Sequence, residues 1–541
     1  MKRKNRVTRT TLREAEKLAL LNFNKQERRG ILSKIHEIIE LYRKRHNIDL
    51  PNALSPALTF SVHTTEREMP EQSKIVLGDV EVPPLPQQDE GIAFAPVTHL
   101  ARWIETGKLS SVHLTKLYLD RLKEYGPALE CIITLSEKRA FEQAERADEE
   151  ISRGKYRGPL HGIPWGAKDL FDTAGIPTTW GAAPFRDRVP NSDAGVVRLL
   201  DEAGAVLTAK LSMGALAFGD VWFGGRTRNP WKIEQPSSGS SAGSAAAVAT
   251  GLVGFSLGTE TCGSIVNPCN RCGVTGLRPT FGRVPRTGTM ALSWSYDKIG
   301  PICRRIEDTV LVLDAINSFD VMDPDSIKAN IYFDANKSLD NLRVGFLPKL
   351  FDKEKATNVE RNTLDLLAQF SVQLQEIELP GLPYELLWTL IKVDAAAAFE
   401  ELTLSDRDDE LRWQALEAWP NIFRVHRFVP AVEYVQIQRF RRHVIHLMDD
   451  IFNGLDALIA PGFVGELDII TNSTGHPALA MPAGFNDDGT PLGVTLYGRP
   501  FDEGTLCRLG LALERELEIY KHRPRLVGNE IAIQSKSVTS D

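Results

Sequence analysis

The chain has 541 residues, of which 25% are charged, and its 64 basic and 71 acidic residues give a net charge of −7. This length is enough to bury a large core, and the mild acidic surplus argues against a nucleic-acid-binding surface. No apolar run is long enough to span a membrane, and the basic start MKRKNRVTRT is not followed by an apolar segment, so export through a signal peptide is not expected.

The first part of the chain, residues 1–69, is expected to be a helical appendage. Within residues 11–46 apolar side chains recur at helical spacing with charged ones between them, which predicts one or two amphipathic helices. Such helices pack on their own protein or join two copies of it, so a homodimer through them stays open, while the mixed charges argue against a membrane-surface helix. Residues 70–96 contain five prolines and are expected to be an extended linker.

Residues 97–525 are expected to form a single α/β body. Helices are predicted over residues 98–126, in two parts around Gly107, and over residues 138–154. Short apolar segments such as AVLTAKL, GFSLGTE, LRVGFLP, LDALIAP and LGVTLYG predict strands between further helices. This alternation favours a mixed, largely internal sheet.

Two later segments differ from the body. Residues 380–450 contain several tryptophans and the run RFRRH, and they are expected to form a helical cap. The cap either helps to choose a substrate or is a solvated structure with ordinary buried tryptophans. Residues 526–541 are expected to be a polar C-terminal tail.

The first residue with a chemical signal is Lys168, at the end of the apolar stretch GPLHGIPWGAKD. A lysine acts as a base only when it is neutral, which requires burial or nearby positive charge to lower its pKa. The apolar neighbours favour the neutral form. Asp169 would favour the charged form if its side chain pointed the same way, and the sequence does not decide between the two.

Two serines follow in glycine-rich settings. Ser240 lies where the loop of SSGSSAGSAAAVATG opens an alanine-rich helix, and Ser264 ends the turn of GTETCGSI. A serine hydroxyl is a weak nucleophile and needs a neighbouring base to take its proton. Glycine lets backbone N–H groups approach a developing oxyanion without obstruction from side chains. Together with Lys168, these serines predict a Ser-Ser-Lys hydrolase that needs no histidine.

Other interpretations of these residues remain open. Residues 239–243 read GSSAG, which matches a nucleophile elbow centred on Ser241, although the preceding TRNPWKIEQPSS is a poor strand. The same loop could be a simple helix N-cap. Cys269 and Cys272 form a C-x-x-C pair, but zinc needs a second pair, so we expect reduced cysteines packed in the core and no metal.

The chain resembles the amidase signature family from about Val97 to Arg523. Two segments carry the resemblance: SSGSSAGSAAAVATGLVGFSLGTETCGSIVNPCNRCGVTGLRPTFGRVPRTG, and the later PALAMPAGFNDDGTPLGVTLYGRPFDEGTL. The resemblance implies that residues 97–525 adopt the amidase signature fold, a large mixed twisted β-sheet covered by α-helices on both faces. It implies no organic cofactor.

The resemblance also implies a role for each motif residue. Ser264 would be the nucleophile that carries the acyl-enzyme, and Lys168 the base. Ser240, held by a cis peptide bond, would relay the proton between them. The implied oxyanion hole consists of the backbone N–H groups of Thr261, Cys262, Gly263 and Ser264.

Several positions depart from the family pattern. Glu260 and Cys262 stand where an aspartate and a glycine are usual, and Val266 replaces an arginine, which bears on specificity more than on catalysis. Met213 matches a methionine that lines the substrate pocket, and His476 has an unusual place. The candidate substrate-binding residues are Met213, Gly239, Ser241, Val266 and His476.

The main expectation is a stand-alone cytoplasmic amidase that cleaves the C–N bond of a small-molecule carboxamide, or an ester or carbamate, with a preference for an apolar acyl group and no nucleic acid as partner. The alternative is the glutamine-hydrolysing A subunit of a tRNA-dependent amidotransferase. A catalytically idle scaffold is a third hypothesis, against which the retained lysine and serines argue.

Overall fold

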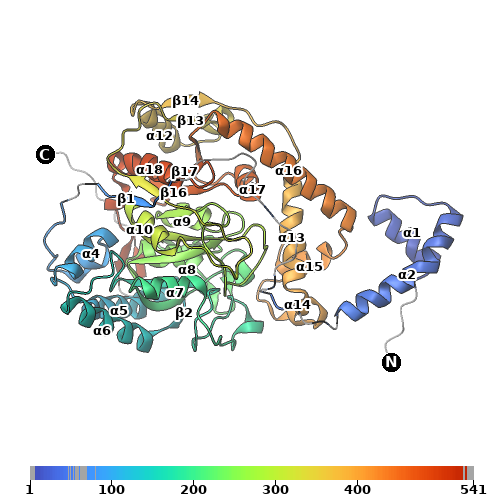
Figure 1. The fold of residues 1–541 in the computed structure, drawn as a ribbon, viewed down its shortest axis with the longest axis horizontal. Coiled ribbons are helices and arrows are strands. Elements are labelled where there is room, and N and C mark those ends of the chain that lie inside the picture. Colours follow the sequence, from blue (N-terminus) through green and yellow to red (C-terminus); the bar gives the residue numbers. More distant parts are fainter. Residues whose placement is uncertain are drawn as a thin grey trace.

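A mixed β-sheet of eleven strands forms the centre of the protein (Figure 1). The structure, a computed structural model, describes residues 7–46, 48, 50–52, 54, 60, 70–78, 81–527 and 530–532, and all counts refer to them. In their order across the sheet, the strands are β14 (Gln373–Glu376), β13 (Arg343–Phe346), β15 (Ala457–Pro461), β17 (Pro491–Gly498), β16 (Ala478–Phe485), β10 (Thr275–Arg278), β11 (Lys298–Cys303), β9 (Phe255–Glu260), β3 (Pro164–Lys168), β4 (Val206–Leu211) and β2 (Ile132–Leu135).

The pairing of β3 with its two neighbouring strands determines the position of Lys168. β3 is parallel to β9 on one side, with Ala167 opposite Leu257, and parallel to β4 on the other. Because parallel strands run in the same direction, their carboxyl ends meet at one edge of the sheet. Lys168, the last residue of β3, therefore lies beside the end of β9, where the turn leading to Ser264 begins.

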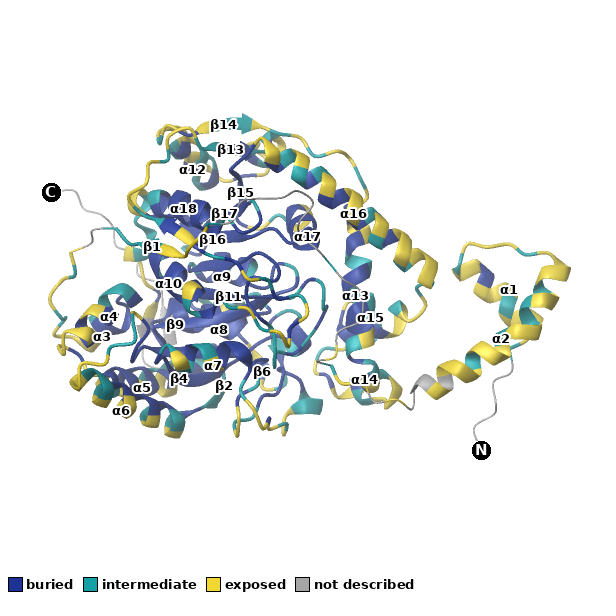
Figure 2. Ribbon diagram, in the orientation of Figure 1, coloured by how far each residue is buried: buried dark blue, intermediate teal, exposed yellow. Residues whose placement is uncertain are grey.

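Helices cover both faces of the sheet, as the fold prediction required. Side chains alternate between the two faces along a strand. On β16, Leu479 and Met481 belong to the same hydrophobic cluster as Leu509 of α18 (Glu503–Leu517). The intervening Ala478 and Ala480 belong to a second cluster, which contains residues of α8 (Ala242–Ala249) and α9 (Val266–Cys272). Figure 2 shows this interior as continuously buried.

The remaining helices of the body agree with the predicted helix–strand alternation. The two helices predicted around Gly107 are α4 (Val97–Glu105) and α5 (Ser111–Leu129). The next predicted helix is α6 (Glu137–Ser152). The others are α3 (Asp89–Ala93), α7 (Gly195–Glu202), α10 (Ile306–Ile316), α11 (Pro348–Phe351), α12 (Asn358–Ala368) and α17 (Gly465–Ser473). β3 was not among the predicted strands, because Pro164 and Gly166 disfavour a strand locally.

Residues 380–450 contain most of a group of helices at one side of the body (Figure 1). The group consists of α13 (Leu387–Ala398), α14 (Glu400–Leu404), α15 (Trp419–His426) and α16 (Ala431–Asn453). α13 packs on α15, α16 and α17. This contact with α17 connects the group to the end of β9, because Asn472 of α17 donates to Glu260 at 2.9 Å.

The N-terminal region carries a small separate element. α1 (Arg9–Leu18) and α2 (Lys25–His46) are joined by an ion pair of 2.7 Å between Glu16 and Arg28, and they stand apart from the body in Figure 1. Most of residues 47–69, within the expected appendage, and residues 533–541 of the expected tail lie outside the described residues. No helix in the described part of the chain is both long and apolar enough to cross a membrane.

Candidate active site

Lys168 is completely buried and lies among hydroxyl groups. Its Nζ is 2.8 Å from the Oγ of Ser240, 3.1 Å from the Oγ of Ser241 and 2.9 Å from the Oγ1 of Thr259. The carbonyl oxygen of Thr259 is 3.2 Å away. A neutral amine in this position can accept a proton from the hydroxyl of Ser240.

Burial lowers the pKa of Lys168 to about 7, against the opposing effects of the negative charges on Asp297 and Glu260. A substantial share of the side chain is therefore neutral at physiological pH, as a general base requires. The carboxylate of Asp169 points elsewhere. It accepts hydrogen bonds from Thr179 and lies 3.3 Å from the Nζ of Lys210, so it does not oppose deprotonation of Lys168.

The two serines of the loop before α8, Ser240 and Ser241, have different hydrogen-bond partners. The peptide bond between Gly239 and Ser240 is cis. The Oγ of Ser241 donates to the carbonyl of Thr259 at 3.1 Å and accepts from its N–H at 3.2 Å, in a fully buried position. The preceding strand β8 (Lys232–Pro236) pairs with β7 (Arg228–Asn229) outside the central sheet, so the structure does not form a nucleophile elbow at Ser241.

Ser264 lies at the end of the turn between β9 and α9, and its carbonyl oxygen accepts from the N–H of Ser241 at 3.1 Å. Among the described residues, no backbone carbonyl outside the strands accepts a hydrogen bond from the N–H groups of residues 261–264. Gly263 has a φ of 75°, and a Cβ at this position would come within 2.8 Å of the Phe463 ring. The turn therefore needs glycine at this position and leaves donors free for an oxyanion.

The buried carboxylate of Glu260 binds backbone N–H groups directly after this turn. One oxygen accepts from the N–H groups of Ile265 and Val266 at 2.8 and 3.0 Å. The other accepts from Arg278 at 2.6 Å and from Asn472 at 2.9 Å. Burial alone would raise the pKa of Glu260, but Arg278 and the hydrogen bonds outweigh it and lower the pKa to about 2.

A cavity of about 600 Å³ opens over Ser264. Among the candidate site residues, its lining includes Gly239, Thr261, Cys262, Gly263 and Ser264. The helices of the 380–450 region also contribute, with Trp388, Ile391, Lys392, Trp413, Trp419 and Ile422. Residues 380–450 thus form one wall of the cavity, to which they contribute three tryptophans.

Four of the predicted substrate-binding residues do not reach this cavity. Met213 and Val266 are fully buried in the two hydrophobic clusters, and Ser241 is bonded to Thr259. His476 is buried, hydrogen-bonded to Thr474 at 2.7 Å, and its ring stacks on Phe452. Which of these side chains face the cavity depends on packing between distant segments, which the motifs alone do not reveal.

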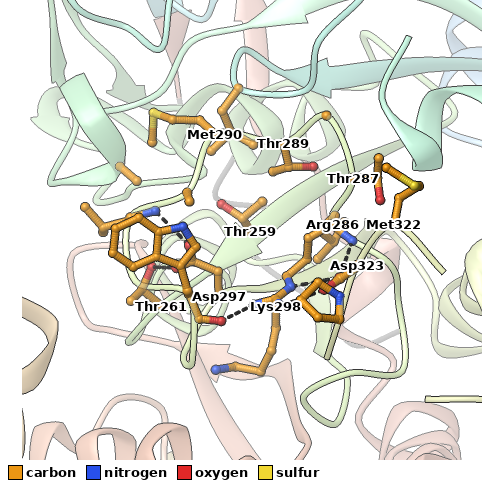
Figure 3. Close-up of a pocket in the computed structure, with 18 residues that line it drawn as sticks. Thr259, Thr261, Arg286, Thr287, Thr289, Met290, Asp297, Lys298, Met322 and Asp323 are labelled. Carbon is orange, nitrogen blue, oxygen red and sulfur yellow. Dashed lines mark hydrogen bonds and ion pairs between the residues drawn. The ribbon is translucent and has the colours of Figure 1, made fainter. Parts of the chain in front are cut away.

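A second cavity of about 220 Å³ shares Ala217, Thr261 and Leu292 with the first (Figure 3). On its wall Thr261 donates to Asp297 at 2.6 Å, and Asp297 also accepts from the N–H groups of Leu292 and Ser293. Asp297 thereby connects the nucleophile turn to residues 292–293. Burial lowers the pKa of the adjacent Lys298 to about 7.

The cysteines are all free, and five of the six are buried. Cys269 and Cys272 lie on α9, where burial raises the pKa of each thiol. In the described part of the chain, no group of three or more histidine, cysteine, aspartate or glutamate side chains could hold a metal ion.

Sequence reasoning missed three residues of this site. Thr259 contacts the Nζ of Lys168, Phe463 covers Gly263, and Asp297 anchors Thr261. Of the three, Thr259 had a sequence signal, because it stands in the predicted strand GFSLGTE, two residues before the turn that begins at Thr261. Phe463 and Asp297 come from distant segments, and no local pattern marks them.

The Amidase family model matches residues 113–507 of this chain. Among curated relatives, the A subunit of the glutamyl-tRNA(Gln) amidotransferase of Carboxydothermus hydrogenoformans is 32% identical over 78% of this chain and 97% of its own length. The protein of the same name from Chloroflexus aggregans is 33% identical over 78% of this chain and 96% of its own.

A solved structure is similar as well. The native peptide amidase from Stenotrophomonas maltophilia has a TM-score of 0.69 and 29% identity, covering 78% of this chain and 97% of that one.

These relatives correct two predictions. The expectation of a stand-alone amidase is wrong, because the curated relatives are named as subunits of an amidotransferase. The expected partners, a small-molecule amide with no nucleic acid and at most a second copy of the chain, are wrong for the same reason, since that name includes a tRNA and implies further subunits. The relatives' names describe subunits of an assembly, whereas the net charge used in the prediction describes one polypeptide. The match over residues 113–507 and these relatives show that the chain belongs to the amidase family of enzymes acting on amide C–N bonds.

Proposed function

We propose that this chain is the glutamine-hydrolysing A subunit of a tRNA-dependent amidotransferase. The observation that carries the proposal is the match to A subunits over 96–97% of their own length at 32–33% identity. The buried pair of Lys168 and Ser240 beside the Ser264 turn supports the chemistry that such a subunit needs.

In the proposed reaction, the Oγ of Ser264 attacks the side-chain carbonyl carbon of glutamine. Its proton passes through Ser240 to the neutral Nζ of Lys168. The C–N bond then breaks, the proton returns through Ser240 to the leaving nitrogen, and ammonia departs. Water, deprotonated through the same relay, hydrolyses the acyl-enzyme and releases glutamate.

The free N–H groups of residues 261–264 are proposed to stabilise the oxyanion that forms during both steps. Removing one such donor costs about a hundredfold or more in rate in other hydrolases. Because hydrogen bonds to Glu260 and Asp297 fix the turn, its backbone N–H groups are in position before the substrate binds.

Charged groups in the cavity suit an amino acid. Lys392 lines the cavity and has no carboxylate within ion-pair distance in the described part of the chain, so it is proposed to bind the α-carboxylate of glutamine. Asp220, paired at 2.9 Å with Arg226, is proposed to receive the α-ammonium group. The tryptophans of the 380–450 region would exclude water around the bound substrate.

The domain organisation is part of the same proposal. Residues 1–69 form an appendage, residues 70–96 a linker, residues 97–525 the catalytic body with the cap over 380–450, and residues 526–541 a tail. A tRNA-linked reaction, together with free thiols, is consistent with a cytoplasmic enzyme.

Copurification from the native source tests the assembly. The full-length chain, tagged at one end, should bring down further subunits, and the complex should convert glutamyl-tRNA(Gln) to glutaminyl-tRNA(Gln) with release of glutamate from glutamine. A chain that purifies alone and releases no ammonia from glutamine in the presence of glutamyl-tRNA(Gln) and a native extract would refute the proposal.

A serine-reactive fluorophosphonate tests the chemistry separately, by intact mass. The wild type should gain one adduct, Ser264→Ala none, and Lys168→Ala should react more slowly. Labelling that survives in Ser264→Ala but is lost in Ser241→Ala would contradict the assigned nucleophile.

A further inference from the structure

A third cavity, of about 310 Å³, lies away from the serines. It shares no lining residue with the catalytic cavity. Ala249 and Gly273 on its wall mark the C-terminal ends of α8 and α9, whose N-terminal ends follow the two serine-bearing turns. The cavity is therefore a separate site at the opposite ends of these helices.

The lining of this cavity, which we call the arginine cavity, is strongly cationic. It includes Arg304, Arg305, Lys521 and Arg523, and no aspartate or glutamate. Arg305 is paired with Glu514 at 2.8 Å, and Lys521 is paired with Glu518. In the described part of the chain, neither Arg304 nor Arg523 has a carboxylate within ion-pair distance, so two of the four cations are left without an ion pair.

The guanidinium groups of this cluster are held in place by aromatic rings and carbonyl groups. The Cζ of Arg523 lies 4.6 Å from the ring centre of Phe94, and that of Arg305 lies 3.5 Å from the ring centre of Tyr520. Arg304 donates to the carbonyls of Ala95 and Val253 at 2.7 and 2.8 Å. Burial lowers the pKa of Arg523; the negative charge of Glu90 opposes this effect, and the positive charge of Arg304 adds to it. An anion that entered the cavity would meet two arginines, Arg304 and Arg523, that have no ion-pair partner among the described residues.

Two tryptophans also line the cavity. The Nε1 of Trp103 donates to the carbonyl of Pro83 at 2.9 Å, and that of Trp231 donates to the carbonyl of Cys272 at 2.8 Å. Because both indole N–H groups are already bonded, these rings contribute fixed apolar surface. The arginine cavity thus combines fixed cations with fixed planar surfaces.

We propose that the arginine cavity binds a nucleoside monophosphate. Its volume is at the lower end of the range of about 300 to 1,000 Å³ for small-molecule sites, which suits a ligand of this size. The guanidinium of Arg523, which donates no hydrogen bond to the described residues, matches the oxygens of a phosphate, and Arg304 and Arg305 add positive charge beside it. The base would lie against the aromatic side chains. Neither half of the ligand alone uses both sets of groups.

Isothermal titration calorimetry of the full-length protein with AMP, adenosine and ribose 5-phosphate tests the proposal. At about 0.1 M salt, where screening limits non-specific attraction, AMP should bind with a Kd below about 1 mM. Adenosine and ribose 5-phosphate should each bind at least about tenfold more weakly, because each lacks one half of the contacts.

Variants locate the site. Arg523→Gln should weaken AMP binding about tenfold or more through loss of a charged hydrogen-bond donor, and Tyr520→Ala should weaken it through loss of stacking. Both side chains lie near the end of the chain and outside the buried core, and thermal melts check that the variants fold. Arg153→Gln, at an exposed arginine paired only with Glu149, is the matched control and should leave the Kd unchanged.

Three results would overturn the proposal. The first is no measurable heat with AMP at concentrations up to about 5 mM. The second is a Kd for AMP that Arg523→Gln and Tyr520→Ala leave unchanged. The third is an equal loss in Arg523→Gln and Arg153→Gln, which would mean general attraction to the surface.

Discussion

Replacing Glu260 by glutamine tests whether this buried carboxylate holds the nucleophile turn. The carboxylate accepts four hydrogen bonds, two on each oxygen, in a fully buried position. Glutamine keeps one acceptor oxygen, so its amide group must face two donors in either orientation. Breaking a buried pair by removing one charge costs about 3 to 5 kcal/mol.

A neighbouring carboxylate limits this cost. Asp468 lies 3.6 Å from Arg278, and burial together with the charge of Glu260 raises the pKa of Asp468 to about 8. Without the charge of Glu260, Asp468 ionises more readily and pairs with Arg278. We therefore expect a loss at the low end, about 3 kcal/mol in the free energy of unfolding.

Equilibrium urea unfolding measures this loss, and fluorophosphonate labelling of Ser264 reports on the turn in the same samples. Glu260→Gln should be labelled more slowly because the start of α9 loses its anchor. Glu149→Gln, in an exposed pair with Arg153, is the control and should cost less than about 1 kcal/mol. A loss below about 1 kcal/mol in Glu260→Gln would refute the reasoning.

Three further predictions concern the same site. The rate of fluorophosphonate labelling should rise with pH, with a midpoint at about 7, as Lys168 loses its proton. Asp297→Asn should move this midpoint to lower pH, because the negative charge of Asp297 favours the protonated lysine. An unchanged midpoint in labelling reactions quenched at fixed times would contradict this role of Asp297. Thr259→Val removes a hydroxyl 2.9 Å from the Nζ of Lys168 and should also lower the midpoint, since a contact to the charged form is lost; a higher midpoint would be the opposite result. Gly263→Ala should reduce labelling at least about a hundredfold, because the turn must move away from Phe463. Phe463→Ala in the same chain should restore only part of the rate, because the positive φ stays strained for alanine, and no recovery at all would contradict the clash with Phe463.

Much of the fold could be predicted because its elements carry local signals. Alternating and continuous apolar runs predicted β4, β9, β13, β15 and β17, and helical spacing with turns at glycine predicted α4, α5 and α6. β3 was missed, since Pro164 and Gly166 mask its strand character. Its pairing with two parallel neighbours, a non-local interaction, outweighs these local preferences.

By itself, the sequence determined which residues are candidates for the chemistry: Lys168, Ser240 and Ser264 stand in glycine-rich or apolar settings that together suit a Ser-Ser-Lys hydrolase. Only the tertiary structure decided how they are used. It turned Asp169 towards Lys210, brought Thr259 to the lysine and Asp297 to the turn, and placed Met213, Val266 and His476 in the core. The physical reason is that residue type follows from local chemistry, whereas side-chain direction and charge environment depend on which distant strands pack side by side.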